Sequence, residues 1–232
     1  MPFGFFFDPT YLLVLPAFVF AMWAQWKVTN TYQKFSQVRA ANGLTGRQMA
    51  QAIMTRNGIQ DVSIEEVGGV LSDHYDPRSK KVRLSPHNYE ESSLAAIAVG
   101  AHEVGHVLQH AQGYAPLGIR AAIAPVANIG SMLAFPLFFI GFFFRSGMSP
   151  VLMNLGLLFF AGAVVFHLIT LPVEFDASKR ALQQLNESGS LAPQEVAGAK
   201  AVLDAAALTY VAAAAMAALN LLRMLMLRNS RN

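Results

Sequence analysis

The sequence predicts a mainly α-helical membrane protein, with about four transmembrane helices and a small α+β part outside the bilayer. Hydrophobic residues make up 54% of the 232 residues, and charged residues only 13%. That charged fraction is about half of what an ordinary soluble domain carries. The apolar residues also gather in long runs that alternate with polar segments. Both observations argue against a disordered chain and against a purely soluble one.

Two further counts exclude classes of function. The chain has no cysteine, which rules out disulfides, thiolate zinc sites and cysteine nucleophiles. The net charge is only +3, the basic residues do not cluster, and no RNA- or DNA-binding motif occurs. We therefore expect no nucleic-acid partner.

Four apolar runs have about the length that a transmembrane helix needs. They cover residues 9–26, 116–144, 150–173 and 205–222. Trp23 and Trp26 end the first run, as expected at a membrane interface. No basic residue precedes this run, so we expect an anchor rather than a cleaved signal peptide. Residues 145–149 predict a tight hairpin between the second and third runs. The alanine-rich fourth run could span the bilayer or lie on its surface.

The positive charges predict the orientation. Nine Lys and Arg residues lie in 27–114 and three in 174–204, whereas Arg145 is the only one in the hairpin. Because cytoplasmic loops carry an excess of Lys and Arg, we expect an outside N-terminus and both polar segments in the cytoplasm. Three arginines of the C-terminal tail count against a fourth span that exits outside. They are Arg223, Arg228 and Arg231.

These runs divide the chain into five segments. We expect an N-terminal anchor, a polar α+β region, a transmembrane hairpin, a polar helix and a C-terminal transmembrane or interfacial helix. Their bounds are 1–26, 27–114, 115–173, 174–204 and 205–232.

Within 27–114 the pattern predicts two helices and three short strands. Thr45 should cap a helix that Gly58 ends, and Ser92 or Ser93 should cap a longer one that Gly113 ends. The strands are expected at 62–66, 70–74 and 81–84.

One motif in the second of these helices carries chemistry. It is His102-Glu103-Val104-Gly105-His106. Histidines four apart lie on one helix face, so both imidazoles can reach one Zn²⁺ at about 2.0–2.1 Å. Glu103 beside them can deprotonate a metal-bound water and return the proton to the leaving amine. This pattern is typical of peptide-bond hydrolysis. The plain alternative is a helix with two surface histidines.

Few residues downstream of the motif can supply the third metal ligand. No Asp or Glu occurs in 107–173, and five carboxylates follow. They are Glu174, Asp176, Glu187, Glu195 and Asp204. Two spans separate the motif from this group, so both lie on one side of the membrane. We favour Glu174, which should open a helix where the third span ends. Ala177 and Ser178, one turn later, would let that helix approach the motif closely.

Other residues near the motif narrow the class. A metzincin needs Gly at position 109 and His at 112, where this chain has Gln109 and Gln112. His110 continues the row of histidines but lies too far along the helix to share one ion with His102 and His106. We interpret His110 as a surface residue or as one that contacts a metal ligand without binding the metal itself.

Three stretches resemble one known family. HEVGH, the apolar hairpin after it and LPVEFDAS at 171–178 are similar to the YugP-like membrane zinc metallopeptidases of bacteria. They resemble more distantly the HtpX and CAAX prenyl protease group of gluzincins. Asp-His-Tyr-Asp-Pro at 73–77, with Lys-Val-Arg-Leu-Ser at 81–85, also fits the YugP-like pattern.

The resemblance implies a zincin-like catalytic part at the cytoplasmic face of a bacterial inner membrane, acting on a peptide or protein. It implies one Zn²⁺ per chain, held by His102, His106 and Glu174, with Glu103 as general base. In the HtpX group an Asp four residues after the ligand Glu orients a ligand histidine. Ser178 stands at that position, and the candidates for the supporting role are Asp176, His167 and Ser178. His167 is otherwise a buried, satisfied histidine inside the span.

Substrate binding is predicted by analogy with other zincins, which commonly pair an edge strand with the substrate backbone. The candidate strand consists of Lys81, Val82, Arg83 and Leu84, and otherwise it is a plain structural strand. His74 could donate a hydrogen bond to the tetrahedral intermediate, or it is an ordinary loop histidine.

Three functions therefore compete. The first is a membrane-anchored zinc endopeptidase with its site at the cytoplasmic face. The second is an intramembrane protease of the site-2 type, which would need the motif inside a span and a downstream Leu-Asp-Gly. That tripeptide is absent, with Leu203-Asp204 a partial match. The third is an inactive membrane scaffold without metal.

Overall fold

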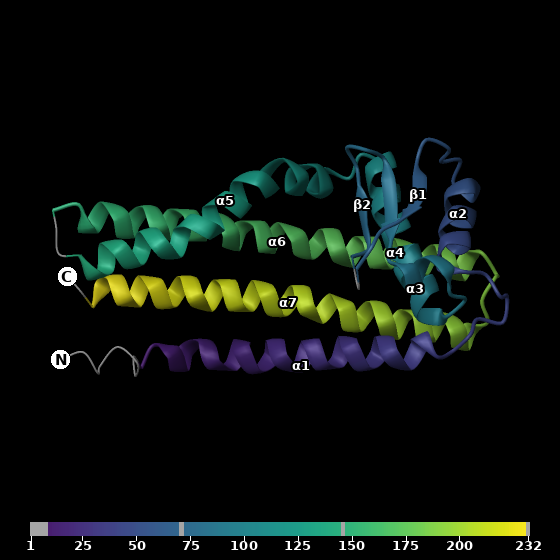
Figure 1. The fold of residues 1–232 in the computed structure, drawn as a ribbon, viewed down its shortest axis with the longest axis horizontal. Coiled ribbons are helices and arrows are strands. Elements are labelled where there is room, and N and C mark those ends of the chain that lie inside the picture. The colour runs from purple at the N-terminus through teal and green to yellow at the C-terminus, as the bar shows by residue number, and fades with distance from the viewer. Residues whose placement is uncertain (1–8, 70–71, 145–146, 231–232) are drawn as a thin grey trace. The chain divides into compact units, whose positions relative to one another are not determined.

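The computed structural model describes residues 9–69, 72–144 and 147–230, and these are mostly helical (Figure 1). The elements in chain order are α1 (Tyr11–Ser36), α2 (Gly46–Arg56), β1 (Ser63–Glu66), β2 (His74–Asp76), β3 (Lys81–Leu84), α3 (Pro86–Glu90), α4 (Leu94–Ala111), α5 (Ala115–Phe143), α6 (Ser149–Glu187) and α7 (Pro193–Asn229). The predicted fold class, a mainly α protein with a small sheet, is confirmed.

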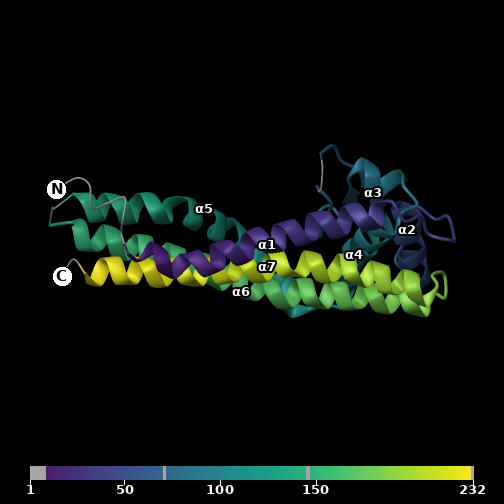
Figure 2. The same cartoon turned by 90° about the horizontal axis from the view of Figure 1, so that it is seen from below.

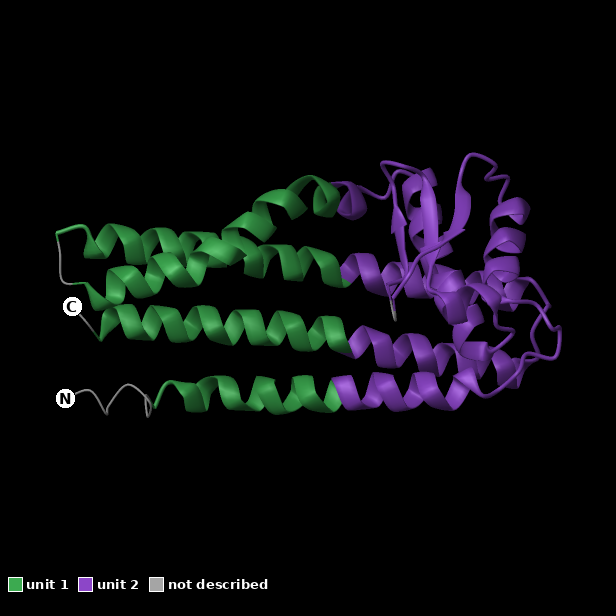
Figure 3. Ribbon diagram, in the orientation of Figure 1, with its two compact units in different colours: residues 1–24, 119–171, 209–232 green, residues 25–118, 172–208 purple. Residues whose placement is uncertain are grey.

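The chain forms two compact units (Figure 3). Unit 1 consists of residues 1–24, 119–171 and 209–232, and unit 2 of residues 25–118 and 172–208. The four helices α1, α5, α6 and α7 contribute residues to both units. Figure 2 shows α7 as one unbroken helix.

Unit 1 is built from apolar helical segments. Among the described residues, α1, α5, α6 and α7 are the helices long and apolar enough to cross a membrane. Many of their large apolar side chains are exposed, for example Leu12, Val126 and Leu158, as expected for a surface that faces lipid. Inside the unit, Gly156 of α6 lies so close to α5 that a Cβ there would be 2.7 Å from Ala134 O.

Two expectations about these helices change. The fourth apolar run is part of α7, which has the length and hydropathy of a span. The prediction that Glu174 opens a helix is wrong, because α6 continues from Ser149 through Pro172 to Glu187. A proline inside a helix usually ends or kinks it, but long apolar helices tolerate one where neighbouring groups satisfy the backbone. Arg145 and Ser146 of the predicted hairpin lie outside the described residues.

Unit 2 contains the sheet and the shorter helices. Thr45 caps α2 through a capping box with Gln48, and Gly58 follows the helix at a φ of 70°, as predicted. The strand order is β1-β3-β2, with β3 parallel to β1 and antiparallel to β2. The second predicted strand, 70–74, is displaced, since β2 begins at His74 and residues 70–71 lie outside the described part.

Helix α4 is the centre of unit 2. Its N-cap is Ser93, whose hydroxyl accepts a hydrogen bond from the backbone N–H of Ala96, and Gly113 follows its end at a φ of 64°. The helix packs against α2, α3, β2 and β3. Ile97 and Val104 of α4 are fully buried together with Val82 and Leu84 of β3. The motif therefore lies on a helix whose position is fixed by the core.

Candidate metal centre

Three side chains from two helices converge on one point in unit 2. His102 and His106 project from α4, and Glu174 projects from α6. The Nε2 atoms of His102 and His106 lie 3.2 and 3.5 Å from Glu174 Oε2. The Glu174 side chain is almost fully buried, and both histidine side chains are largely so.

Small residues allow the two helices to come this close. Gly105, between Glu103 and His106, lies against the backbone of Ala177, and a Cβ at Gly105 would be 2.3 Å from Ala177 O. Ala177 is fully buried. Ser178, one residue later, places its hydroxyl 3.1 Å from His102 Nδ1. The close approach predicted for Ala177 and Ser178 is confirmed.

The donor set fits a zinc ion. Two imidazoles and one carboxylate are ligands that Zn²⁺ takes in catalytic sites, with a fourth position left open. Bonds of roughly 2.0–2.1 Å in a tetrahedron place neighbouring ligand atoms about 3.3 Å apart. The Nε2–Oε2 distances of 3.2 and 3.5 Å agree with that spacing. His102, His106 and Glu174 could therefore hold one metal ion.

Glu103 lies beside these donors and is buried. Burial raises the pKa of Glu103 to about 7, the positive field of His102 opposes the rise, and the carboxylates of Glu174 and Asp73 add to it. A hydrogen bond from the backbone of Tyr75 in β2 also opposes the rise. A carboxyl group with this pKa can accept and release a proton near neutral pH.

The Nδ1 atoms of His102 and His106, which are the ring nitrogens not directed at Glu174, have partners. Ser178 contacts Nδ1 of His102, and Gln109 Oε1 lies 3.0 Å from Nδ1 of His106. Gln109 in turn donates to Asp176 Oδ2 at 2.9 Å. Of the residues predicted to support the site, Ser178 therefore contacts the candidate ligand His102 directly. Asp176 reaches the candidate ligand His106 through Gln109. Sequence reasoning missed Gln109, whose spacing of three from His106 on a helix was the available signal.

The remaining candidate histidines lie elsewhere. His167 belongs to unit 1, two turns before Glu174 along α6, and its ring stacks edge-on with Phe166. His110 is exposed, and its Nδ1 is 2.7 Å from the hydroxyl of Tyr75. His74 is also exposed, with Nδ1 2.8 Å from Ser72 O and Nε2 3.3 Å from Arg83. The roles predicted for His74 and His167 stay predictions.

The predicted substrate strand needs a correction. Lys81–Leu84 is the central strand β3, and both of its edges are paired, so its backbone is not an exposed edge. Val82 and Leu84 are fully buried. The edge that lies beside the motif belongs to β2, because Tyr75 of β2 contacts Glu103.

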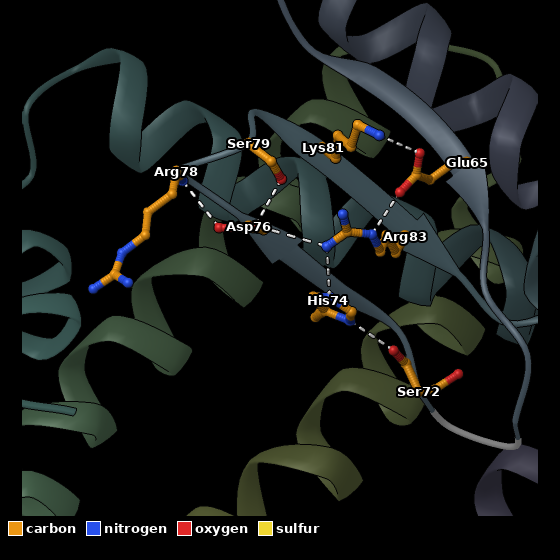
Figure 4. A network of polar contacts seen from close by, with 8 residues as sticks. All are labelled: Glu65, Ser72, His74, Asp76, Arg78, Ser79, Lys81 and Arg83. Atoms are coloured by element: carbon orange, nitrogen blue, oxygen red, sulfur yellow. Dashed lines mark hydrogen bonds and ion pairs between the residues drawn. The ribbon is translucent and has the colours of Figure 1, made fainter. Parts of the chain in front are cut away.

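The charged side chains of β3 hold the sheet together (Figure 4). Arg83 Nε lies 2.6 Å from Glu65 Oε1 in β1, and Lys81 Nζ lies 2.7 Å from Glu65 Oε2. On the other side, Arg83 reaches Asp76 of β2 at 3.7 Å. Hydrogen bonds from Lys81 and Arg83 lower the pKa of Glu65. Lys81 and Arg83 therefore join neighbouring strands.

With this geometry in place, comparison with known proteins decides the family. The model of a family described as "Putative neutral zinc metallopeptidase" matches residues 10–229. The chain belongs to this family. It is also 46% identical over 215 residues to "Putative membrane protease YugP" of Bacillus subtilis (strain 168), which covers 93% of this chain and 94% of that protein.

Membership of this zinc metallopeptidase family confirms the resemblance to the YugP-like metallopeptidases. The four apolar helices fit the description of the relative as a membrane protein. No solved structure matches the chain.

Proposed function

We propose that this member of the zinc metallopeptidase family is a membrane-embedded zinc endopeptidase. The observation that carries the proposal is the cluster of His102, His106 and Glu174, with the Nε2 atoms of the histidines 3.2 and 3.5 Å from Glu174 Oε2. Glu103 lies next to this cluster, in the position of a general base. One Zn²⁺ per chain would be held by these three donors.

Each residue of the site has a defined part in the reaction. When bound, the zinc ion supplies a Lewis acid that polarises the scissile carbonyl and acidifies water. Glu103 accepts a proton from the attacking water and returns it to the leaving amine. The burial of Glu103 and of the donors excludes bulk water and strengthens each electrostatic contact.

The substrate class is a peptide or protein bound in extended form. A free strand edge next to the catalytic residues can pair with the backbone of such a substrate. The outer edge of β2 meets this requirement, since Tyr75 of β2 contacts Glu103.

The location of α4 favours this function over an intramembrane protease of the site-2 type. Among the described helices, the candidate spans are α1, α5, α6 and α7, and α4 is not one of them. The two histidines of the motif therefore project from a helix in unit 2 that lacks the hydropathy of a span. The third alternative, an inactive scaffold, predicts no bound metal. Zinc content per chain distinguishes this scaffold from both kinds of protease.

The test is zinc content per chain, measured by mass spectrometry on detergent-purified wild type, Glu174→Ala and Glu103→Gln. We expect about one zinc in wild type, clearly less in Glu174→Ala and an unchanged amount in Glu103→Gln. Peptide hydrolysis should fall at least about 100-fold in Glu103→Gln, because the general base is lost. Absence of metal from folded, zinc-supplied wild type would establish the scaffold instead.

We also propose that the site faces the cytoplasm of a bacterial cell membrane, as the distribution of Lys and Arg suggests. The chain has no cysteine, so single cysteines can report the side directly. A cysteine at exposed Arg78 in unit 2 should resist membrane-impermeant thiol reagents in intact cells and react after lysis. Labelling of that cysteine in intact cells would show that unit 2 faces the outside of the cell, opposite to the proposed orientation.

A further inference from the structure

Gln109 is a polar residue in the middle of a packed helix interface. It lies three residues after His106 on α4, and no part of it is exposed. All of its polar atoms have partners. Its Oε1 lies 3.0 Å from His106 Nδ1, and its Nε2 donates to Val173 O at 2.7 Å and to Asp176 Oδ2 at 2.9 Å.

These partners decide which end of the amide faces His106. A backbone carbonyl and a carboxylate only accept hydrogen bonds, so both must face the NH₂ group of Gln109. Its carbonyl oxygen is then left for His106, and that oxygen can only accept. His106 must therefore carry a proton on Nδ1, and in the neutral ring this leaves the lone pair on Nε2, the nitrogen that faces Glu174.

Asp176 is held in place from the other side. Its Oδ2 pairs with Arg180 Nε at 2.5 Å. Arg180 also hydrogen-bonds Gln112, the residue at the C-terminal end of α4, and lies over the ring of Tyr114. Gln109 and Gln112 occupy the positions at which a metzincin would have Gly and His, and both connect α4 with α6 in this structure.

His102 lacks such a constraint. Its Nδ1 contacts the hydroxyl of Ser178 at 3.1 Å. A hydroxyl can donate or accept, so Ser178 suits either tautomer of His102. The two histidines of the motif are therefore supported differently.

We propose that Gln109 is a positioning residue that fixes His106 in the tautomer required for zinc, and that Asp176 acts through it. We call Asp176, Gln109 and His106 the amide relay. The proposal rests on the proposed zinc site. Partners of this kind, on the outer nitrogen of a ligand histidine, typically contribute about 10- to 100-fold in metal affinity.

The decisive variant is Gln109→Met, which keeps the length of the side chain and removes its hydrogen bonds. Zinc affinity is measured on the full-length protein in detergent, by competition with a chromophoric chelator. We expect Gln109→Met to lower zinc affinity about 10- to 100-fold. Ser178→Ala, the matched control on His102, should lower it less. Equal losses in the two variants, or wild-type affinity in Gln109→Met, would overturn the relay.

A second variant leaves Gln109 itself in place. Asp176→Asn replaces the acceptor-only carboxylate with an amide, so that Val173 O alone still holds the NH₂ group of Gln109 in its orientation. The double variant with Gln109→Met should then lose little more zinc affinity than Gln109→Met alone, because both act through one path. Additive losses would indicate two independent packing effects and contradict the proposal.

The tautomer of His106 gives a readout that packing alone would not change. In metal-free protein labelled with ¹⁵N-histidine, two-bond proton–nitrogen spectra distinguish the two tautomers, and His106→Ala identifies the signal. We expect the Nδ1–H form in wild type and a mixture in Gln109→Met. If wild type binds no zinc, the proposed function fails. If wild type binds one zinc with His106 already mixed, only the relay fails.

Discussion

Gly105 and Ala177 are in backbone contact across the two helices that carry the candidate zinc ligands. A Cβ at Gly105 would lie 2.3 Å from Ala177 O, closer than any side chain can approach. The ligands on either side of this contact depend on it, because His106 follows Gly105 and Glu174 lies one turn before Ala177 and Ser178. The close approach of α4 and α6 therefore depends on the absence of a side chain at Gly105.

We predict that Gly105→Ala moves these helices apart and removes zinc. The added methyl group meets backbone, which cannot rotate away, so the loss should equal or exceed the roughly 1–3 kcal/mol of an overpacked core. Thermal unfolding and zinc content per chain measure the two effects. Gly118→Ala is the control, because a Cβ there meets nothing within 4 Å. A fully loaded Gly105→Ala with the wild-type unfolding temperature would show that α4 and α6 tolerate a wider spacing.

A second prediction concerns the polar network that connects α1 with the start of β2. The fully buried Asn88 donates to Asp73 at 2.9 Å and accepts a hydrogen bond from the hydroxyl of Tyr32 at 2.8 Å. The hydroxyl of Tyr32 is the donor in this contact, because the amide oxygen of Asn88 can only accept. Asn88→Ala removes the acceptor of the Tyr32 hydroxyl, whereas Asp73 keeps its hydrogen bonds from Ser85. Leaving one such polar group unsatisfied costs about 1–3 kcal/mol.

Thermal unfolding of the full chain in detergent measures this loss. We expect the midpoint of Asn88→Ala to fall by several degrees, at roughly 2–4 °C per kcal/mol for a chain of this size. His87→Ala on the same short helix is the control, because its side chain is 70% exposed and pairs with Glu91. Equal midpoints for the two variants would contradict a structural role for Asn88.

A third prediction concerns Arg83, which joins all three strands. Arg83→Met removes its contacts with Glu65, Asp76 and His74 together. The partly exposed ion pairs are each weak, and we expect a combined loss of about 1–2 kcal/mol. Hydrogen exchange should speed up in β2, which contributes few hydrogen bonds of its own to the sheet.

Arg78→Met is the matched control for Arg83. The Arg78 side chain extends away from the network (Figure 4), while its backbone N–H bonds Asp76. We expect its effect to stay within about 0.5 kcal/mol, as for most surface substitutions. Unchanged exchange in β2 of Arg83→Met would mean that backbone pairing alone holds this strand.

Much of this arrangement could be predicted from local patterns. The caps at Thr45 and Ser93 and the stops at Gly58 and Gly113 depend on neighbours within a few residues, and they lie where expected. The pairing of Glu174 with the motif also follows from sequence, because carboxylates are scarce in this chain.

Features set by long-range packing could not be predicted in this way. Alternation of apolar residues identifies Lys81–Leu84 as a strand but carries no information on strand order, so its central position was missed. Pro172 resembles a helix start in isolation, and only the surrounding apolar helix lets α6 continue through it. From the sequence, Gln109 resembles a surface residue, whereas in the structure α6 covers it and it is fully buried.

The last prediction concerns substrate binding at β2. Its outer edge lies beside Glu103, and Tyr75 directs its backbone toward that residue. An extended peptide hydroxamate that binds zinc should pair with this edge, because strand addition forms backbone hydrogen bonds along an edge strand. Hydrogen exchange in residues 72–78 should then slow on binding, whereas residues 63–66 of β1, at the far side of the sheet, should not change. Protection of β1 instead, or of neither strand under conditions of full inhibition, would place the substrate on another surface of unit 2.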